Sequence, residues 1–265
     1  MNSKDYLKIV QSFIEKDGRQ LDILNRGLVR CFKPKQNGPC FLLTGINPSF
    51  KEEQDVFPGR IDDIDISTAN DGYWAKKSHQ FGSMWEHISY LDLFPIRETH
   101  QHNGFEKSFR EETILRKDLL EITQSEIETL APKLIVHANK DSIYYWGIKK
   151  NTPLGKDAND YENPWMGYKV ERVPVQDLPP CMRINNRWEL FPFYKIVGFQ
   201  ENEKRINQKK YPKKTSIEGS FIMEYVMDDR NPKYNGKLYK ETLINCKESP
   251  KEWTEIWKWV NKHKP

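Results

Sequence analysis

The stretch that decides the fold runs from residue 40 to residue 50 and reads CFLLTGINPSF. Its first six residues, CFLLTG, are almost continuously apolar, which is typical of a strand buried on both faces of a parallel sheet. Gly45 allows a tight turn as the chain leaves this strand, and Pro48 biases Asn47 toward an extended conformation. We therefore expect Asn47 to be a positioned polar group, whose carbonyl can accept a hydrogen bond from water while its NH₂ donates elsewhere. The alternative is an ordinary turn, because Asn-Pro and Gly-x-Asn clusters mark loops.

Outward from this stretch, apolar periodicity and turn signals alternate between helices and strands. Helices are expected over 4–17, 20–32, 81–90, 105–130, 141–147 and 253–262, and strands over 40–45, 90–94, 133–137, 193–199 and 220–227. Residues 46–72 are predicted to form a long polar, acidic loop, and residues 151–190 an insertion with a hairpin around YKVERVPV (168–175). The order of elements predicts an α/β fold, a three-layer α/β/α sandwich with a central, mostly parallel four-stranded sheet and C-terminal insertions. We expect a single domain over 1–265.

The composition is that of a folded protein with no membrane partner. The 265 residues carry a net charge of +4, are 37% hydrophobic and include 12% aromatic residues, enough to anchor a core. No apolar run approaches the roughly 18 residues of a membrane span, and the N-terminus lacks the apolar region of a signal peptide. The four cysteines and the histidines show no metal-binding spacing. We expect loop or surface histidines, no metal, no cofactor, reduced thiols, a cytoplasmic location and a monomer.

Ligands of parallel α/β sheets bind at the carboxyl ends of the strands, so three strand ends are candidates: Thr44–Phe50, Asp92–Thr99 and His137–Asp141. The second contains one charged residue in an apolar strand. A carboxylate at Asp92 is costly unless it is paired or solvated in a cleft. The alternatives to a functional role are that Asp92 caps the next element or pairs with Arg97.

The order of these motifs resembles the uracil-DNA glycosylase superfamily, and most closely its mismatch-specific uracil/thymine branch. The resemblance spans roughly residues 38–147. The motifs that carry it are FLLTGINPS (41–49), YWAKKSHQFGSMW (73–85), YLDLFP (90–95) and APKLIVHANKDS (131–142). It implies a DNA base-excision glycosylase that hydrolyses the N-glycosidic bond of a damaged or mismatched base, with base flipping on a duplex. The alternatives are a catalytically inactive nucleic-acid or nucleobase-binding module on the same fold, and an α/β enzyme of another kind.

By this resemblance, Asn47 orients the water that attacks the deoxyribose C1′. Asp92 stands where the family carries an Asn that reads the base, and an ionised Asp only accepts hydrogen bonds, so uracil specificity is in doubt. The flipped base would contact the turn after the first strand and stack on an aromatic side chain. The residues implied in base binding are Gly45, Ile46, Pro48, Ser49, Phe50, Tyr73 and Trp74. Core packing is the alternative for Trp74.

Charge is distributed in two opposed segments. Residues 201–214, which include Tyr211, carry a net charge of +4, and residues 51–65 carry a net charge of −4. The basic segment is compatible with binding to DNA phosphates, and a solvated loop is the alternative. Its candidate phosphate contacts are Lys204, Arg205, Lys209 and Lys210. The second family motif is missing, and its nearest counterpart by position is the loop with Gln200, Asn202, Lys204 and Arg205. The acidic segment would repel a duplex unless it folds away.

Overall fold

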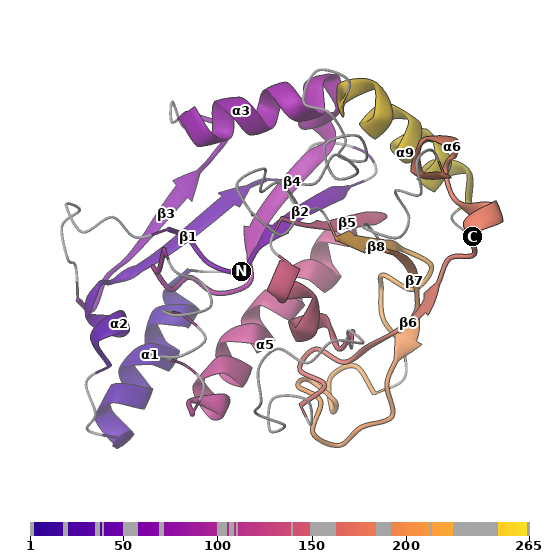
Figure 1. Cartoon of the computed structure of the whole chain (residues 1–265). Coiled ribbons are helices and arrows are strands. Elements are labelled where there is room, and N and C mark those ends of the chain that lie inside the picture. Colours follow the sequence, from indigo (N-terminus) through magenta and orange to yellow (C-terminus); the bar gives the residue numbers. More distant parts are fainter. Residues whose placement is uncertain are drawn as a thin grey trace, which may run out of the picture.

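The computed structural model describes residues 3–17, 21–34, 38, 40–49, 58–68, 72–99, 105, 109, 111–138, 140–148, 163–183, 192–212, 214–224 and 249–263. The fold is α/β, as the sequence predicts, with one mixed sheet of eight described strands in the order β3-β1-β4-β2-β5-β8-β7-β6 (Figure 1). The strands are β1 (Leu28–Lys33), β2 (Phe41–Gly45), β3 (Ile61–Asp65), β4 (Ile88–Asp92), β5 (Leu134–His137), β6 (Tyr168–Arg172), β7 (Phe193–Phe199) and β8 (Phe221–Glu224). The α-helices are α1 (Lys4–Asp17), α2 (Asp22–Asn25), α3 (Gly72–Phe81), α5 (Thr113–Leu130), α6 (Pro180–Arg183) and α9 (Ser249–His263), and the 3-10 helices are η1 (Gly82–His87), η3 (Lys140–Trp146) and η5 (Val175–Asp177).

The expectation of a four-stranded sheet is wrong, because the sheet has twice that number of strands. Four adjacent strands, β4, β2, β5 and β8, run parallel to one another. On one side β1 runs antiparallel to β4 and parallel to β3, and on the other side β7 runs antiparallel to both β8 and β6. The outer strands β3 and β6 are only partly buried, so no continuous apolar run marks them in the sequence.

Two apolar clusters fill the space between the sheet and its helices. On one face α1 and α5 cover side chains such as Leu42, Leu91 and Ile135. On the other face α3, η1 and α9 cover their neighbours in the strands, such as Phe41 and Leu43. Alternate residues of β2 thus belong to opposite clusters, and every residue of β2 is buried. This confirms the prediction that CFLLTG is a strand buried on both faces.

Two predicted elements at the N-terminal side need correction. The helix expected over 20–32 is limited to Asp22–Asn25, and Leu28–Lys33 forms β1 instead. Gly27, with a φ of 74°, lies between them in the left-handed region that a non-glycine residue avoids. The loop expected over 46–72 contains β3, which pairs in parallel with β1. Here pairing with a neighbouring strand overrode the local pattern.

Other boundaries also differ. The helix expected over 81–90 is η1, which begins at Gly82 and ends at His87, and α3 precedes it. The helix expected over 105–130 is confirmed as α5 from Thr113 onward, and residues 106–108 and 110 lie outside the described residues. The hairpin expected around 168–175 is wrong, because β6 pairs with β7 rather than with residues that follow it directly. The strand over 193–199 is confirmed, and the strand over 133–137 and the closing helix are confirmed with shifts of a few residues at their ends. Of the strand expected over 220–227, Phe221–Glu224 is confirmed as β8, and residues 225–227 lie outside the described residues. Among the described residues, no helix has both the length and the apolar character that a membrane crossing needs.

A buried carboxylate joins α5 to β6 and to the segment before β8. Glu128 of α5 accepts hydrogen bonds from the Tyr168 hydroxyl (2.8 Å), from the Ser216 backbone N–H (2.7 Å) and from the Thr215 hydroxyl. Its charge raises the pKa of Tyr168, in addition to the larger effect of burial. A carboxylate with this many donors is fully compensated for its burial.

We therefore predict that Glu128→Ala lowers the free energy of unfolding by about 3 kcal/mol, because several donors lose their acceptor in the protein interior. Urea denaturation followed by circular dichroism measures this change. The matched control is Glu121→Ala, which removes an exposed carboxylate from the same helix and should change stability by less than about 0.5 kcal/mol. Equal effects of the two substitutions would contradict the assignment.

Candidate functional site

The carboxyl ends of β2 and β4 bring the two polar residues singled out in the sequence to one edge of the sheet. Gly45 of β2 is the register partner of Asp92 in β4. The two chains stay paired beyond the strands, because Leu93 N–H donates to Gly45 O (3.0 Å) and Glu98 N–H to Pro48 O (3.0 Å). Within the parallel set, the chain passes from β2 to β4 on one side of β2, and then to β5 on the other side of β2. The point where successive strands change sides in this way is where ligands bind in open α/β sheets.

Asn47 is held in one orientation by backbone carbonyls. It is only 8% exposed, and its Nδ2 donates to Glu98 O (2.7 Å) and to Pro48 O (3.0 Å). Both amide hydrogens are therefore used, which also fixes the amide oxygen on the other side of the group. Asn47 Oδ1 is buried, and it accepts no hydrogen bond from the residues that the structure describes. The geometry is that of a fixed acceptor, with its donors bound elsewhere as the sequence predicts.

An ion pair supports the segment that holds Asn47. Arg26, which follows α2, contacts Glu98 through Nη1 and Oε2 at 2.7 Å, and both side chains are largely buried. Arg97 Nη1 in turn donates to Arg26 O at 3.1 Å. The backbone at residues 97–98 is thus tied to the start of β1, and its carbonyl positions the Asn47 amide. Sequence reasoning missed Arg26, because nothing in the local pattern connects it with a residue 72 positions away.

Asp92 is a buried carboxyl group with one strong hydrogen bond. It is 5% exposed, and the Tyr90 hydroxyl donates to its Oδ1 at 2.7 Å. Burial raises the pKa of Asp92 to about 7, although the Tyr90 hydrogen bond acts in the opposite direction. The expected alternative of a pair with Arg97 is wrong: within the described part of the chain no cation lies at ion-pair distance from Asp92, and Arg97 bonds Arg26 O instead. Near neutral pH the acid and the carboxylate are therefore both populated.

Trp74 extends this arrangement into α3. Its ring meets the Tyr90 ring edge to face, with centroids 4.6 Å apart, and the side chain is 8% exposed. Tyr90 and Asp92 are two residues apart on β4 and so share one face of the sheet, and Trp74 packs on that face. Trp74 thus belongs to the apolar cluster under α3, as the core-packing alternative expects, and at the same time ends a chain of contacts that leads to Asp92.

The remaining residues implied in base binding are placed as follows. Gly45, Ile46 and Pro48 are buried, and Ser49 is exposed. The side chain of Ile46 packs in the cluster under α1 and α5. Phe50 and the side chain of Tyr73 lie outside the described residues. The structure thus joins Trp74, Tyr90 and Asp92 in a chain of contacts, and it places Asn47 after the end of β2, where Gly45 pairs with Asp92.

The basic segment 201–214 lies elsewhere. It packs against α5, where the Asn207 amide donates to Gln124 Oε1 (3.1 Å) and Lys210 Nζ contacts Ser125 Oγ. Helix α5 covers the face of the sheet opposite to α3. The structure therefore does not bring this segment to the face that carries Tyr90 and Asp92.

Arg205 is not a surface residue of that segment. It is 4% exposed, its guanidinium lies 4.1 Å from the centroid of the Phe199 ring, and its Nη2 donates to Tyr211 O (2.8 Å). Burial lowers the pKa of Arg205. A Cβ at Gly167 would come within 2.1 Å of the Arg205 side chain, so glycine leaves room for it. The expected phosphate contact at Arg205 is therefore corrected to a packing role, whereas Lys204, Lys209 and Lys210 are exposed.

The loop that was the nearest counterpart of the second motif is also used internally. Gln200 Nε2 donates to Gly147 O (2.8 Å) and Tyr168 O (3.0 Å), and Asn202 Oδ1 accepts from Lys204 N–H (2.9 Å). His137, expected on the surface or in a loop, is fully buried at the end of β5, where its Nδ1 bonds Ser142 Oγ (2.7 Å). Among the described residues, no three His, Cys, Asp or Glu side chains are grouped so that they can hold a metal ion.

The raised pKa of Asp92 predicts a pH dependence of stability. Between the unfolded value near 4 and the folded value near 7, the native state binds more protons than the unfolded state, so the free energy of unfolding falls as pH rises through this window. The contribution levels off above pH 7 and amounts to at most about 4 kcal/mol. Asp92→Asn should remove it: the variant should gain stability relative to the natural protein between pH 5 and pH 8. Urea titrations at pH 5 and pH 8 measure the free energy of unfolding of both proteins. If the difference between the variant and the natural protein is the same at the two pH values, the pKa of Asp92 is not raised.

No protein-family model, no curated protein and no solved structure matches this chain. Any functional conclusion therefore depends on the geometry of the site and on the motifs of the sequence.

Proposed function

We propose that this chain is a DNA glycosylase-like hydrolase with a three-layer α/β/α core, which cleaves the N-glycosidic bond of a damaged or mismatched base. The observation that carries the proposal is Asn47, whose amide oxygen is buried, fixed and unbonded within the described structure, at the carboxyl end of the central strand. The parallel set β4-β2-β5-β8, covered by helices on both faces, supports the sandwich (Figure 1). The sequence motifs that resemble the uracil-DNA glycosylase superfamily include the segments that carry Asn47, Trp74 and Asp92.

In the proposed reaction, Asn47 Oδ1 accepts a hydrogen bond from a water molecule. This hydrogen bond orients the water so that a lone pair on the water oxygen faces C1′ of the deoxyribose. The C1′–O bond forms as the C1′–N bond breaks, the base leaves with the bonding electron pair, and the proton of the water passes to solvent. An amide is no general base, so the rate depends on electrostatic stabilisation of the oxocarbenium-like transition state. We therefore expect slow turnover, with no metal and no cofactor.

Asp92 sets the choice of base in this proposal. Tyr90 occupies Oδ1, so the second carboxyl oxygen is the one that a base can use. When protonated, this oxygen donates to a carbonyl group, such as those of uracil or hypoxanthine. When ionised, it accepts from an amino group, such as those of cytosine or adenine. With a pKa near 7, the preference changes within the physiological pH range.

The proposed partner is DNA, single- or double-stranded. Lys204, Lys209 and Lys210 are exposed and remain candidates for phosphate contacts, but their place beside α5 puts them away from Asp92. They can add a salt-dependent attraction to a nucleic acid without aligning it in the site.

A second candidate is a nucleic-acid or nucleobase-binding module without turnover on the same fold. Two observations favour it. Asp92 stands where the resembled family reads the base with Asn, and the side chains of Gln200 and Arg205 are bonded inside the protein rather than presented to a phosphate. Binding without cleavage would follow if no group completes the transition-state stabilisation around Asn47.

Cleavage assays with labelled oligonucleotides distinguish these candidates. The panel carries uracil, hypoxanthine, xanthine or mismatched bases in single and double strands. We expect slow strand cleavage after alkali, reduced at least about 100-fold in Asn47→Ala because the water loses its acceptor. The control Asn261→Ala, on the exposed side of α9, should retain activity. Absence of cleavage by the natural protein, with binding that weakens as salt increases, would instead establish the binding module.

A second prediction concerns the base. Asp92→Asn keeps a donor and an acceptor at every pH, so it should strengthen cleavage or binding of uracil-containing DNA at pH 8, where Asp92 is ionised, and change it much less at pH 6. Parallel rate or affinity measurements at the two pH values test this. An unchanged or weaker response of the variant at pH 8 would remove Asp92 from the base-binding role.

A further inference from the structure

A hollow lies between η1 and α9, at the amino end of β4 and so at the opposite end of that strand from Asp92. Its volume is about 520 Å³, and it is lined by Ser83, Lys251, Thr254, Glu255 and Lys258. A hollow of this size is in the range of small-molecule sites. It is independent of the site described above, because none of its residues belongs to the edge of the sheet that carries Asn47.

The lining comes from one stripe of α9 and one residue of η1. The four α9 residues form two neighbouring rows along the helix, Thr254 with Lys258 and Lys251 with Glu255, each pair four residues apart. Helix α9 contacts η1, and Ser83 of η1 lines the hollow together with these α9 residues. The buried side of α9, with residues such as Trp253 and Trp257, fixes the helix on the sheet. The polar stripe is thus held at a set position against η1.

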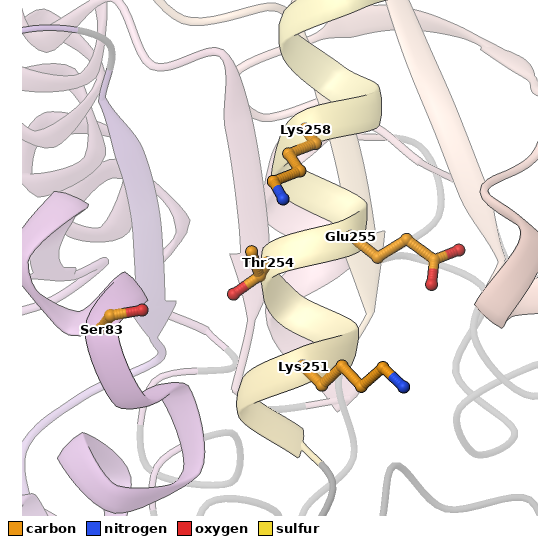
Figure 2. A pocket seen from close by; sticks show the side chains of 5 residues that line it. All are labelled: Ser83, Lys251, Thr254, Glu255 and Lys258. Carbon is orange, nitrogen blue, oxygen red and sulfur yellow. The ribbon is translucent and has the colours of Figure 1, made fainter.

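The side chains around the hollow point in two directions. Figure 2 shows the hydroxyl groups of Ser83 and Thr254 turned toward each other across the gap, with the Lys258 ammonium bent back toward Thr254. Glu255 and Lys251 point to the other side of α9, and Glu255 Oε1 accepts from the Cys181 backbone N–H at 2.9 Å. Within the described part of the chain, no carboxylate forms an ion pair with Lys258. The side facing η1 therefore presents two hydroxyls and one positive charge.

We propose that this hollow binds the phosphate group of a small phosphate-bearing molecule through Ser83, Thr254 and Lys258. A tetrahedral anion has oxygens to meet donors from three sides, and lysine binds phosphate as a point charge. The two hydroxyls come from η1 and α9, so the bound anion bridges the two elements. The volume left beside the phosphate accommodates the organic part of the molecule.

The test is a titration of the ¹⁵N-labelled full chain with inorganic phosphate, at constant ionic strength and pH 7.5, followed by NMR. We expect saturable shifts at the amides of Ser83 and Thr254, and an affinity about tenfold weaker in Lys258→Met because a charged donor is lost. Thr254→Val should also weaken binding. The matched control Lys262→Met removes the same charge from the same helix, at an exposed position that does not line the hollow, and should leave the affinity within about twofold.

Each other outcome overturns the proposal. Shifts that grow linearly without saturation would show only general ionic effects. Equal weakening by Lys258→Met and Lys262→Met would show attraction to the net charge of α9 rather than a site. Equal affinity for acetate at the same concentration would exclude recognition of a phosphate. Circular dichroism confirms that each variant is folded, which is expected because both lysines are exposed.

Discussion

The structure depends on the complete burial of β2. This strand is hydrogen-bonded on both sides, to β4 and β5, and covered on both faces, so none of its polar backbone groups can rely on water. Each must be paired within the sheet. The pairing continues past the end of the strand: Ala138 N–H donates to Thr44 O (2.8 Å) and Phe94 N–H to Ile46 O (2.9 Å). The turn after β2 is thus as strongly positioned as the strand itself.

This constraint explains why the amide of Asn47 is so well defined. Asn47 Nδ2 donates to the carbonyl of Glu98 and to that of Pro48, which also accepts from the Glu98 backbone N–H. The same burial leaves Oδ1 unbonded within the described structure, at a cost of about 1–3 kcal/mol. Asp92, at the end of the neighbouring strand, carries a similar cost, expressed as a raised pKa. Two unfavourable polar groups at one edge of a sheet are typical of a functional site.

How far the sequence predicts the structure differs between the centre and the edges of the sheet. Strands β2, β4 and β5 are buried on both faces, and their continuous apolar runs make them visible in the sequence. Strand β3 reads IDDID and exists because β1 pairs with it, which no local pattern reveals. In the site, the loop chemistry around Asn47 is readable from Gly45 and Pro48. The ion pair of Arg26 with Glu98 and the burial of Arg205 depend on contacts between segments distant in the chain. A single sequence does not show which distant segments come into contact.

The opposed charges of the sequence also take on a physical meaning in the fold. The described acidic residues of 51–65 lie in β3, at the edge of the sheet and three strands from β2, which is roughly 14 Å at the usual spacing. Asp62 pairs with Arg60 (2.8 Å), and Asp63 lies 3.7 Å from Arg30. An edge strand with carboxylates resists pairing with other chains. Because about 14 Å exceeds the screening length of roughly 8 Å at physiological salt, these paired charges repel an anion at Asn47 only weakly. The acidic character of β3 therefore fits protection of a sheet edge.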